Sequence, residues 1–226
     1  MQGKVIVVTG ALGALGKVVA ETAQSRGARV AGIDHAPSQI SATPERIEIG
    51  GVDLSDAAQA KMAVEAAARH FGKLDVLINI AGGFAFETVG DGDIKTWQRM
   101  HALNLLTALN ASHAALPHLA ASKAGRIVNI GAMGALQAGS GMGPYAASKA
   151  GVHRLTEALA SEWKGKVTVN AVLPSIIDTQ ANRADMPKAD FAKWVTPQEL
   201  AEVILFLASD AASGVTGALI PVGGRV

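Results

Sequence analysis

The hydrophobic residues of this chain gather in short runs rich in Val and Ile, and longer amphipathic segments separate the runs. Gly or Pro bounds the runs, a pattern that predicts β-strands. Between them, apolar residues recur at the spacing of one helix face, which predicts helices over residues 15–27, 56–72, 96–125 and 151–163. The strand-like runs cover residues 4–10, 29–34, 74–82, 125–131, 166–174 and 217–224, and one further strand is expected just before Asp53.

Nearly continuous apolar strands that alternate with helices predict a parallel sheet covered on both faces. No internal repeat, low-complexity tract or linker divides the 226 residues. We therefore expect a single doubly wound α/β domain of the Rossmann type over residues 1–226. The segment 182–195 has the weakest periodicity, and we expect it to form a loop with a short helix near the functional site.

Charge and composition exclude several classes of function. The formal net charge is +1 and the basic residues are scattered, so neither nucleic acid nor a membrane surface is expected as a partner. Every apolar run is far shorter than the roughly 18–20 residues that span a bilayer. Cysteine is absent, which excludes disulfides and thiolate chemistry. The histidines lack ligand spacing, so no metal is expected. The chain enters a strand at once, and we expect a cytoplasmic protein without a cleavable signal.

The first turn, in "VVTGALGALGKVVA", places glycines directly after a strand and directly before a helix. Small residues there let the backbone approach a pyrophosphate, and the N-terminus of the helix faces its charge. A tight structural turn is the alternative, but the strand, turn and helix fall where dinucleotide binding requires them. The residues expected to contact a dinucleotide in this turn are Gly10, Leu12, Gly13, Ala14, Leu15 and Gly16.

The second strand ends in Asp34, about twenty residues after the glycine turn, a typical spacing for this fingerprint. A carboxylate at this place accepts hydrogen bonds from the adenosine ribose and repels a 2′-phosphate. The next residue is His35 rather than Arg. These features favour NAD(H) over NADP(H), with a loop cap as the alternative role of Asp34.

Two later strand ends also fit a dinucleotide. Asp53 and Leu54 follow the third strand, where we expect them near the adenine. Asp53 could equally cap the helix that begins near Ser55, or do both. The fourth strand ends with small residues where the cofactor must pass close to the backbone, and we expect contacts from Asn79, Ala81 and Gly82.

Tyr145 and Lys149 lie four residues apart in a predicted helix, so both side chains lie on one face. A phenol has an ordinary pKa of about 10. A neighbouring ammonium favours the phenolate and makes the tyrosine a usable acid or base. Such a pair is common by chance, but beside a nucleotide fingerprint it predicts proton transfer in a nicotinamide-dependent reaction.

The motifs "TGALGALG", "NIAG", "YAASK" and "LPSIIDT", together with Asn104, resemble the short-chain dehydrogenase/reductase family over essentially the whole chain. The resemblance implies that Tyr145 donates the proton, that Lys149 also holds the nicotinamide ribose, and that Asn104 joins a water relay behind Lys149. A helix residue bonded to backbone is the alternative for Asn104. The family also implies a small-molecule substrate and a homodimer or homotetramer, and it places beside the nicotinamide Pro174, Ile177 and Thr179.

Several positions depart from the family pattern. Ala14 stands where a glycine is usual, Ser175 also replaces a glycine, and Val222 stands where an aspartate is frequent. Most importantly, Ala132 occupies the position of the catalytic serine. Losing one such hydrogen-bond donor costs about 2.7–4 kcal/mol of barrier. Ser140, in the following loop, has the wrong spacing to replace it.

The stretch "GAMGALQAGSGMGPYAASKAGVH" and the residues 178–197 resemble the quinonoid dihydropteridine reductases, which also have alanine at the serine position and prefer NADH. A quinonoid dihydropterin accepts hydride into a conjugated ring, where charge is delocalised and one tyrosine can suffice. Aromatic and methionine side chains would suit the walls of such a pocket, or they are ordinary core or interface residues. The candidates are Phe84, Phe86, Met142, Met186, Phe191 and Trp194.

Two other hypotheses stand beside this one. The first is a general short-chain alcohol or carbonyl dehydrogenase in which water or another side chain replaces the serine. The second is a non-catalytic nucleotide-binding module, whose only support is Ala132.

Overall fold

All seven strands are parallel and form one sheet in the order β3-β2-β1-β4-β5-β6-β7, in a computed structural model that describes residues 1–38 and 42–226. The order reverses beside β1, because β2 and β3 extend to one side of it and the later strands to the other. The predicted doubly wound sheet is therefore confirmed. The strands are β1 (Val5–Thr9), β2 (Arg29–Ile33), β3 (Arg46–Ile49), β4 (Val76–Asn79), β5 (Gly125–Ile130), β6 (Val167–Pro174) and β7 (Leu219–Val222).

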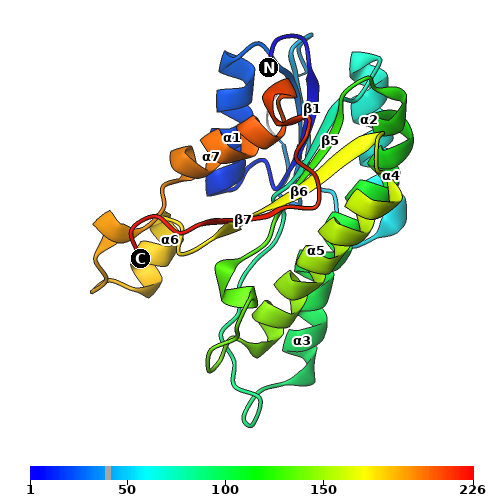
Figure 1. Ribbon diagram of the computed structural model, residues 1–226. Coiled ribbons are helices and arrows are strands. Elements are labelled where there is room, and N and C mark those ends of the chain that lie inside the picture. Colours follow the sequence, from blue (N-terminus) through cyan, green and yellow to red (C-terminus); the bar gives the residue numbers. More distant parts are fainter. Residues whose placement is uncertain (39–41) are drawn as a thin grey trace.

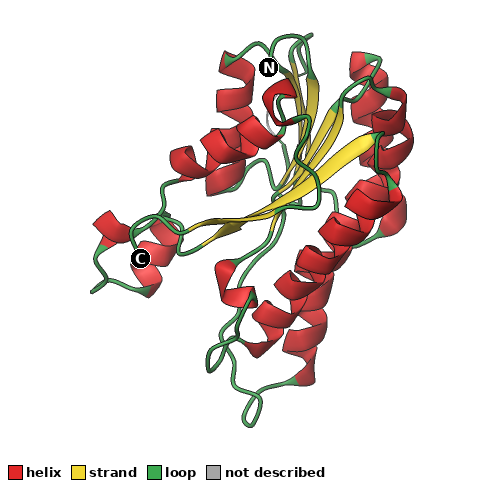
Figure 2. Ribbon diagram, viewed as in Figure 1, coloured by secondary structure: helices red, strands yellow, loops and turns green. Residues whose placement is uncertain are grey.

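Helices cover both faces of this sheet (Figures 1 and 2). One layer consists of α1 (Ala14–Ser25) and α7 (Pro197–Leu207). The other layer consists of α2 (Ala57–Phe71), α4 (Thr107–Ala121) and α5 (Gly143–Glu162). The strands read as continuous apolar runs because both of their faces are buried. In β1, Ile6 and Val8 pack with α1 and α7, whereas Val5 and Val7 pack with α2 and α4.

The predicted helix over residues 96–125 consists of three successive parts. It begins as α3 (Ile94–Met100), continues as the π-helical turn η1 (His101–Leu106) and ends as α4. Such π turns are rare and often lie at functional sites. The weakly periodic segment 182–195 contains the end of α6 (Gln180–Asp185) and the 3₁₀ turn η3 (Phe191–Lys193), which agrees with the expected loop and short helix. Two further 3₁₀ turns are η2 (Met133–Ala135) and η4 (Asp210–Ala212).

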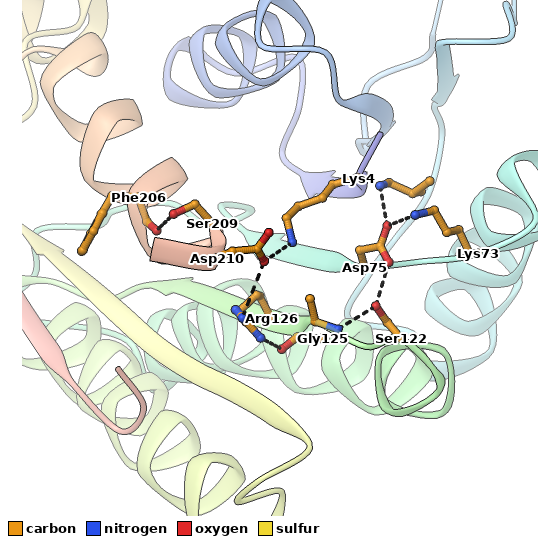
Figure 3. A network of polar contacts seen from close by, with 11 residues as sticks. Lys4, Lys73, Asp75, Ser122, Gly125, Arg126, Phe206, Ser209 and Asp210 are labelled. Atoms are coloured by element: carbon orange, nitrogen blue, oxygen red, sulfur yellow. Dashed lines mark hydrogen bonds and ion pairs between the residues drawn. The ribbon is translucent and has the colours of Figure 1, made fainter. Parts of the chain in front are cut away.

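The edge of the sheet where the strands begin is held together by a polar network (Figure 3). Asp75, just before β4, accepts a hydrogen bond from the backbone N–H of Val5 (2.9 Å) and pairs with the ammonium of Lys73 (2.7 Å). Its second oxygen accepts from the hydroxyl of Ser122 (2.7 Å). This buried carboxylate thus joins the beginnings of β1 and β4 to the end of α4.

Candidate active site

A large cavity lies at the opposite edge, where the strands end and where the strand order reverses. It has a volume of about 1220 Å³, and residues after β1, β2, β4, β5 and β6 line it. Ligands of open parallel sheets bind at this place, because the connections diverge there and leave a crevice. The cavity contains most of the residues that the sequence singled out.

The glycine turn has the geometry that close approach of a ligand needs. Gly10 has a φ of +66°, and a Cβ on it would lie 2.9 Å from the backbone nitrogen of Ala81. A side chain on Gly16 would run into the carbonyl of Gly10. Gly13 precedes α1 without any side-chain cap, so the N-terminus of this helix faces the cavity with unpaired N–H groups for an anion. All the turn residues predicted to contact a cofactor line the cavity: Gly10, Leu12, Gly13, Ala14, Leu15 and Gly16.

Asp34 follows β2 and lines the same cavity. One carboxylate oxygen accepts from the backbone N–H of Leu12 at 2.9 Å, and the other accepts from that of Ala36 at 3.0 Å. The side chain therefore fixes the glycine turn from beside the place expected for the adenosine ribose. Each oxygen keeps further lone pairs with which it can accept ribose hydroxyls.

Asp53 also lines the cavity, as does Leu54. Asp53 accepts hydrogen bonds from the N–H (2.9 Å) and the hydroxyl (2.7 Å) of Ser55, and the largest cause of its lowered pKa is this hydroxyl. The N-cap of α2 is Asp56, which accepts from two backbone N–H groups of the first turn. The alternative that Asp53 caps this helix is thus wrong, because the helix begins two residues later than that alternative assumed.

The end of β4 differs in part from expectation. Ala81 and Gly82 line the cavity, but Asn79 lies outside its lining. Asn79 is buried and donates to the hydroxyl of Ser112 at 3.0 Å and to the side-chain oxygen of Asn129 at 2.9 Å. Its amide therefore joins β4 to β5 and α4, and its position gives no support to a cofactor contact.

Tyr145 and Lys149 both line the cavity from the first turns of α5. Burial raises the pKa of Tyr145 to about 12, so the phenol keeps its proton at neutral pH. The sequence argument expected the ammonium to lower this pKa, but burial dominates. Burial likewise lowers the pKa of Lys149 to about 8. The ammonium donates to the carbonyl of Ile130 at 2.8 Å, which anchors it at the end of β5.

Asn104 lies in the π turn and is almost completely buried, outside the lining. Its amide oxygen accepts from the N–H of Gly83 (2.9 Å) and its amide nitrogen donates to the carbonyl of the same residue (3.0 Å). The nitrogen also donates to the hydroxyl of Ser148 (2.9 Å), which donates to the carbonyl of Tyr145 (2.7 Å). Asn104 thus fixes the cavity wall after β4 and bonds to backbone, as the alternative reading expected. The water relay stays a prediction.

Ala132 lines the cavity two residues after β5 and is almost fully buried. Its methyl group brings no hydrogen-bond donor to the place where the family pattern has a hydroxyl. Ser140, the other hydroxyl considered, is exposed and lies outside the lining.

The remaining wall of the cavity is mostly apolar. The rings of Phe84 and Tyr145 meet edge to face, with centroids 5.0 Å apart. Phe86, Met142 and Met186 also line the cavity, whereas Phe191 and Trp194 pack on each other outside it. The three residues expected beside the nicotinamide all line it: Pro174, Ile177 and Thr179.

Sequence reasoning missed several lining residues, among them Thr107, Asn182 and Asp185. Asn182 and Asp185 lie on α6, which approaches the cavity only because β6 ends beside it. Their polar side chains fall in the segment of weakest periodicity, so no spacing distinguishes them from ordinary surface residues. Within residues 1–38 and 42–226, no group of three or more His, Asp or Glu side chains could hold a metal ion, and no helix is long and apolar enough to cross a membrane.

A glycine turn, a carboxylate after β2 and a long cavity at the reversal point define a dinucleotide-binding α/β protein. The family model described as short chain dehydrogenase matches residues 4–190, and the chain belongs to this family. It is an NAD(P)-dependent oxidoreductase, as the members of that family are.

Known proteins support this assignment over the whole chain. The 3-oxoacyl-(acyl-carrier-protein) reductase of Thermotoga maritima is 31% identical, with 99% of this chain and 98% of that protein covered. The D-threitol dehydrogenase of Mycolicibacterium smegmatis is also 31% identical, with 99% and 93% covered. Among solved structures, the carveol dehydrogenase of Mycobacterium avium in complex with NAD has a TM-score of 0.87 and 28% identity, and the match covers 99% of this chain and 97% of that one.

Proposed function

We propose that this protein is an NADH-dependent reductase of a conjugated ring, with a quinonoid dihydropterin as the first substrate to test. The observation that carries the proposal is Ala132, which lines the cavity where a carbonyl reductase of this family has a hydroxyl. A ring that delocalises charge needs fewer donors than an isolated ketone oxygen, which develops a localised negative charge.

The cofactor preference follows from the charge beside the glycine turn. Asp34 brings a carboxylate to the position expected for the adenosine ribose, where it would accept hydroxyl groups and repel a 2′-phosphate. The glycine turn fits a dinucleotide, because it is too tight for side chains on Gly10 and Gly16 and leaves the uncapped N-terminus of α1 facing the cavity. When bound, the nicotinamide supplies the hydride.

Tyr145 is the proton donor in this proposal. Its phenol is protonated at neutral pH because burial raises its pKa to about 12, so it can donate to a substrate nitrogen or oxygen that gains basicity as hydride arrives. The ammonium of Lys149 stabilises the resulting phenolate. Lys149 is held for this purpose by the carbonyl of Ile130. The substrate thus gains one hydride and one proton.

The apolar wall supports a flat substrate. Phe84 stands edge to face with Tyr145, and Phe86 and Met142 line the cavity nearby. Side chains of this kind give a flat ring a large contact area.

The second candidate function is a general alcohol or carbonyl dehydrogenase. The relatives favour it, since one is named as a 3-oxoacyl reductase and another as a D-threitol dehydrogenase. Under this reading a water molecule or another side chain replaces the missing hydroxyl.

The test is the rate of NADH oxidation with freshly generated quinonoid dihydropterin, followed optically, with NADPH as the cofactor control and Tyr145→Phe as the proton-donor control. Fast turnover that favours NADH and is lost in the variant is the expected result. Tight NADH binding without turnover would refute the ring substrate and leave the second candidate.

Ala132→Ser separates the two candidates in the same assay. A restored hydroxyl should raise ketone reduction by about 100-fold or more if a carbonyl is the natural substrate, since one such donor contributes that much. With a conjugated ring as the substrate, the rate should stay within about threefold of wild type, because the ring does not depend on that donor.

A further inference from the structure

The end of β5 is joined to α5 by a series of buried hydrogen bonds. The amide of Asn129 donates to the hydroxyl of Thr156 at 2.9 Å. Lys149 donates to the carbonyl of Ile130 at 2.8 Å. Thr156 and Lys149 are seven residues apart in sequence, two helical turns, and therefore lie on one face of α5. The catalytic helix thus holds the strand end just before the cavity wall.

A third hydrogen bond continues this series into the cavity wall itself. The backbone N–H of Ala132 donates to Nε2 of His153 at 3.3 Å, at the long end of the usual range. His153 lies four residues after Lys149 and eight after Tyr145, so the three side chains form one stripe of α5. His153 is only 2% exposed. His153 is thus a buried titratable group without a role in the proton transfer from Tyr145.

The backbone of Gly131 is shaped around this imidazole. A Cβ at position 131 would lie 2.5 Å from Nε2 and 2.7 Å from Cδ2 of His153, and 3.1 Å from a methyl carbon of Leu173. The ring therefore fills the space that any other residue would need. Close packing on one side and a hydrogen bond on the other leave residues 131 and 132 little freedom to move.

The imidazole must be neutral to accept this bond, with its proton on Nδ1. Burial, aided by the charges of Arg154 and Lys149, lowers the pKa of His153, and the nearby Glu157 only partly opposes this. At neutral pH the ring is thus in the acceptor form that the geometry requires.

We propose that His153 is a positioning residue for the reaction: it anchors Ala132 and keeps Ile130 in place as the acceptor for Lys149. Because the N–H of Ala132 is engaged by His153, residue 132 offers the substrate neither a side-chain nor a backbone donor. Tyr145 then has to supply the proton, and the cavity wall formed by residues 130–132 keeps a fixed shape beside it. The inference rests on the proposed roles of Tyr145 and Lys149 and is independent of which substrate is reduced.

Two substitutions of similar size test the proposal. His153→Leu removes the acceptor, and His153→Gln offers an amide oxygen near the position of Nε2. The leucine variant leaves the buried N–H of Ala132 without its acceptor, so we expect kcat to fall about tenfold. Substrate KM should stay within about twofold, since no group that binds the substrate is lost. The glutamine variant should recover most of kcat, and His113→Leu, an exposed histidine on α4, serves as the unchanged control.

Amide hydrogen exchange at Ala132 provides a readout that needs no substrate. We expect exchange at this amide to be about tenfold faster in His153→Leu than in wild type or His153→Gln. If the leucine variant lowers only the melting temperature and leaves kcat unchanged, the positioning role is wrong. Unchanged exchange at Ala132 would overturn the anchoring itself. If wild type reduces neither quinonoid dihydropterin nor a ketone, the proposed function fails, and the exchange experiment still decides the anchoring.

Discussion

The charged groups at the two edges of the sheet differ in their main partners. At the edge where the strands begin, charges pair with each other: Lys73 with Asp75 and Lys4 with Asp210, both at 2.7 Å. At the edge where the strands end, Asp178 and Arg183 also pair with each other. The two charged groups proposed to act in the cavity instead bond to backbone: Asp34 accepts from N–H groups and Lys149 donates to a carbonyl.

This difference separates stability from function along the same strands. Two charges that pair with each other stabilise the fold, but little of their charge remains available to bind a ligand. A charge held by backbone keeps its net charge available, so a ribose hydroxyl or a phenolate can use it. The first edge should therefore respond to mutation in stability, and the second in activity.

Tyr145→Phe should produce the largest loss at the functional edge. The ring and its contact with Phe84 stay, but the proton is gone, so kcat should fall by about a thousandfold, within the usual range for a general acid. Stopped-flow or steady-state NADH oxidation measures the loss, with the melting temperature as the control for folding. A variant that keeps a tenth of the wild-type rate would show that another group donates the proton.

The sequence predicted the strands and the glycine turn well because local physics determines them. The apolar run before Gly10 must be buried on both faces, and the backbone at Gly10 needs a positive φ that glycine adopts freely. Asp34 lines the same cavity as the glycine turn because the end of β2 is next to the end of β1 in a parallel sheet.

The parts that the sequence did not predict depend on partners that are distant in the chain. The amide of Asn79 bonds to Ser112 and Asn129 instead of lining the cavity, and the residues near Asn79 in the sequence do not indicate these partners. The π turn around Asn104 exists in a segment whose apolar spacing reads as one helix. His153 is a lone histidine in a helix, and its significance comes from Ala132, which is 21 residues away.

Asp75→Ala should have the largest effect at the other edge. Removal of this buried carboxylate leaves Lys73, Ser122 and the N–H of Val5 without their partner, and we expect a loss of about 3 kcal/mol in the free energy of unfolding. Urea unfolding measures it. kcat should be unchanged in the folded variant.

Asp210→Ala is the matched control at this edge. Asp210 pairs with Lys4 at the same distance and lies 3.9 Å from Arg126, but its own side chain is 73% exposed, so its loss should cost less than that of Asp75. Equal losses from the two variants would contradict the buried network as the source of stability.

Asp34→Asn removes one negative charge at the functional edge and keeps the size and shape of the side chain. The amide keeps an acceptor for the N–H of Leu12 or Ala36 but no longer repels a 2′-phosphate. We expect the ratio of kcat/KM for NADH over NADPH to fall about tenfold, a change of about 1.4 kcal/mol. Asp190→Asn, an exposed carboxylate outside the cavity, should leave the ratio unchanged. An unaltered ratio in Asp34→Asn would assign the cofactor preference to other residues.

The last prediction concerns pH, to which the two edges respond in different pH ranges. Burial lowers the pKa of Lys149 to about 8, below its ordinary 10.5. Between these values the unfolded chain binds more protons than the folded one, so the free energy of unfolding should rise with pH. Activity should instead fall by half near pH 8 as the ammonium is lost.

At the other edge, burial raises the pKa of Asp75, but hydrogen bonds from Lys73, Val5 and Ser122 outweigh it and leave the pKa lowered below 3.8. Its contribution to stability is present above that value and is lost as pH falls through the lowered pKa. Urea unfolding of wild type and Lys149→Met from pH 7 to 10 isolates the Lys149 response, because only wild type should gain stability over that range. Burial raises the pKa of Tyr145 to about 12, so its opposite effect begins only above this range. A flat wild-type curve would mean that Lys149 is not held charged and buried, and the contrast between backbone-bonded and paired charges would lose its strongest example.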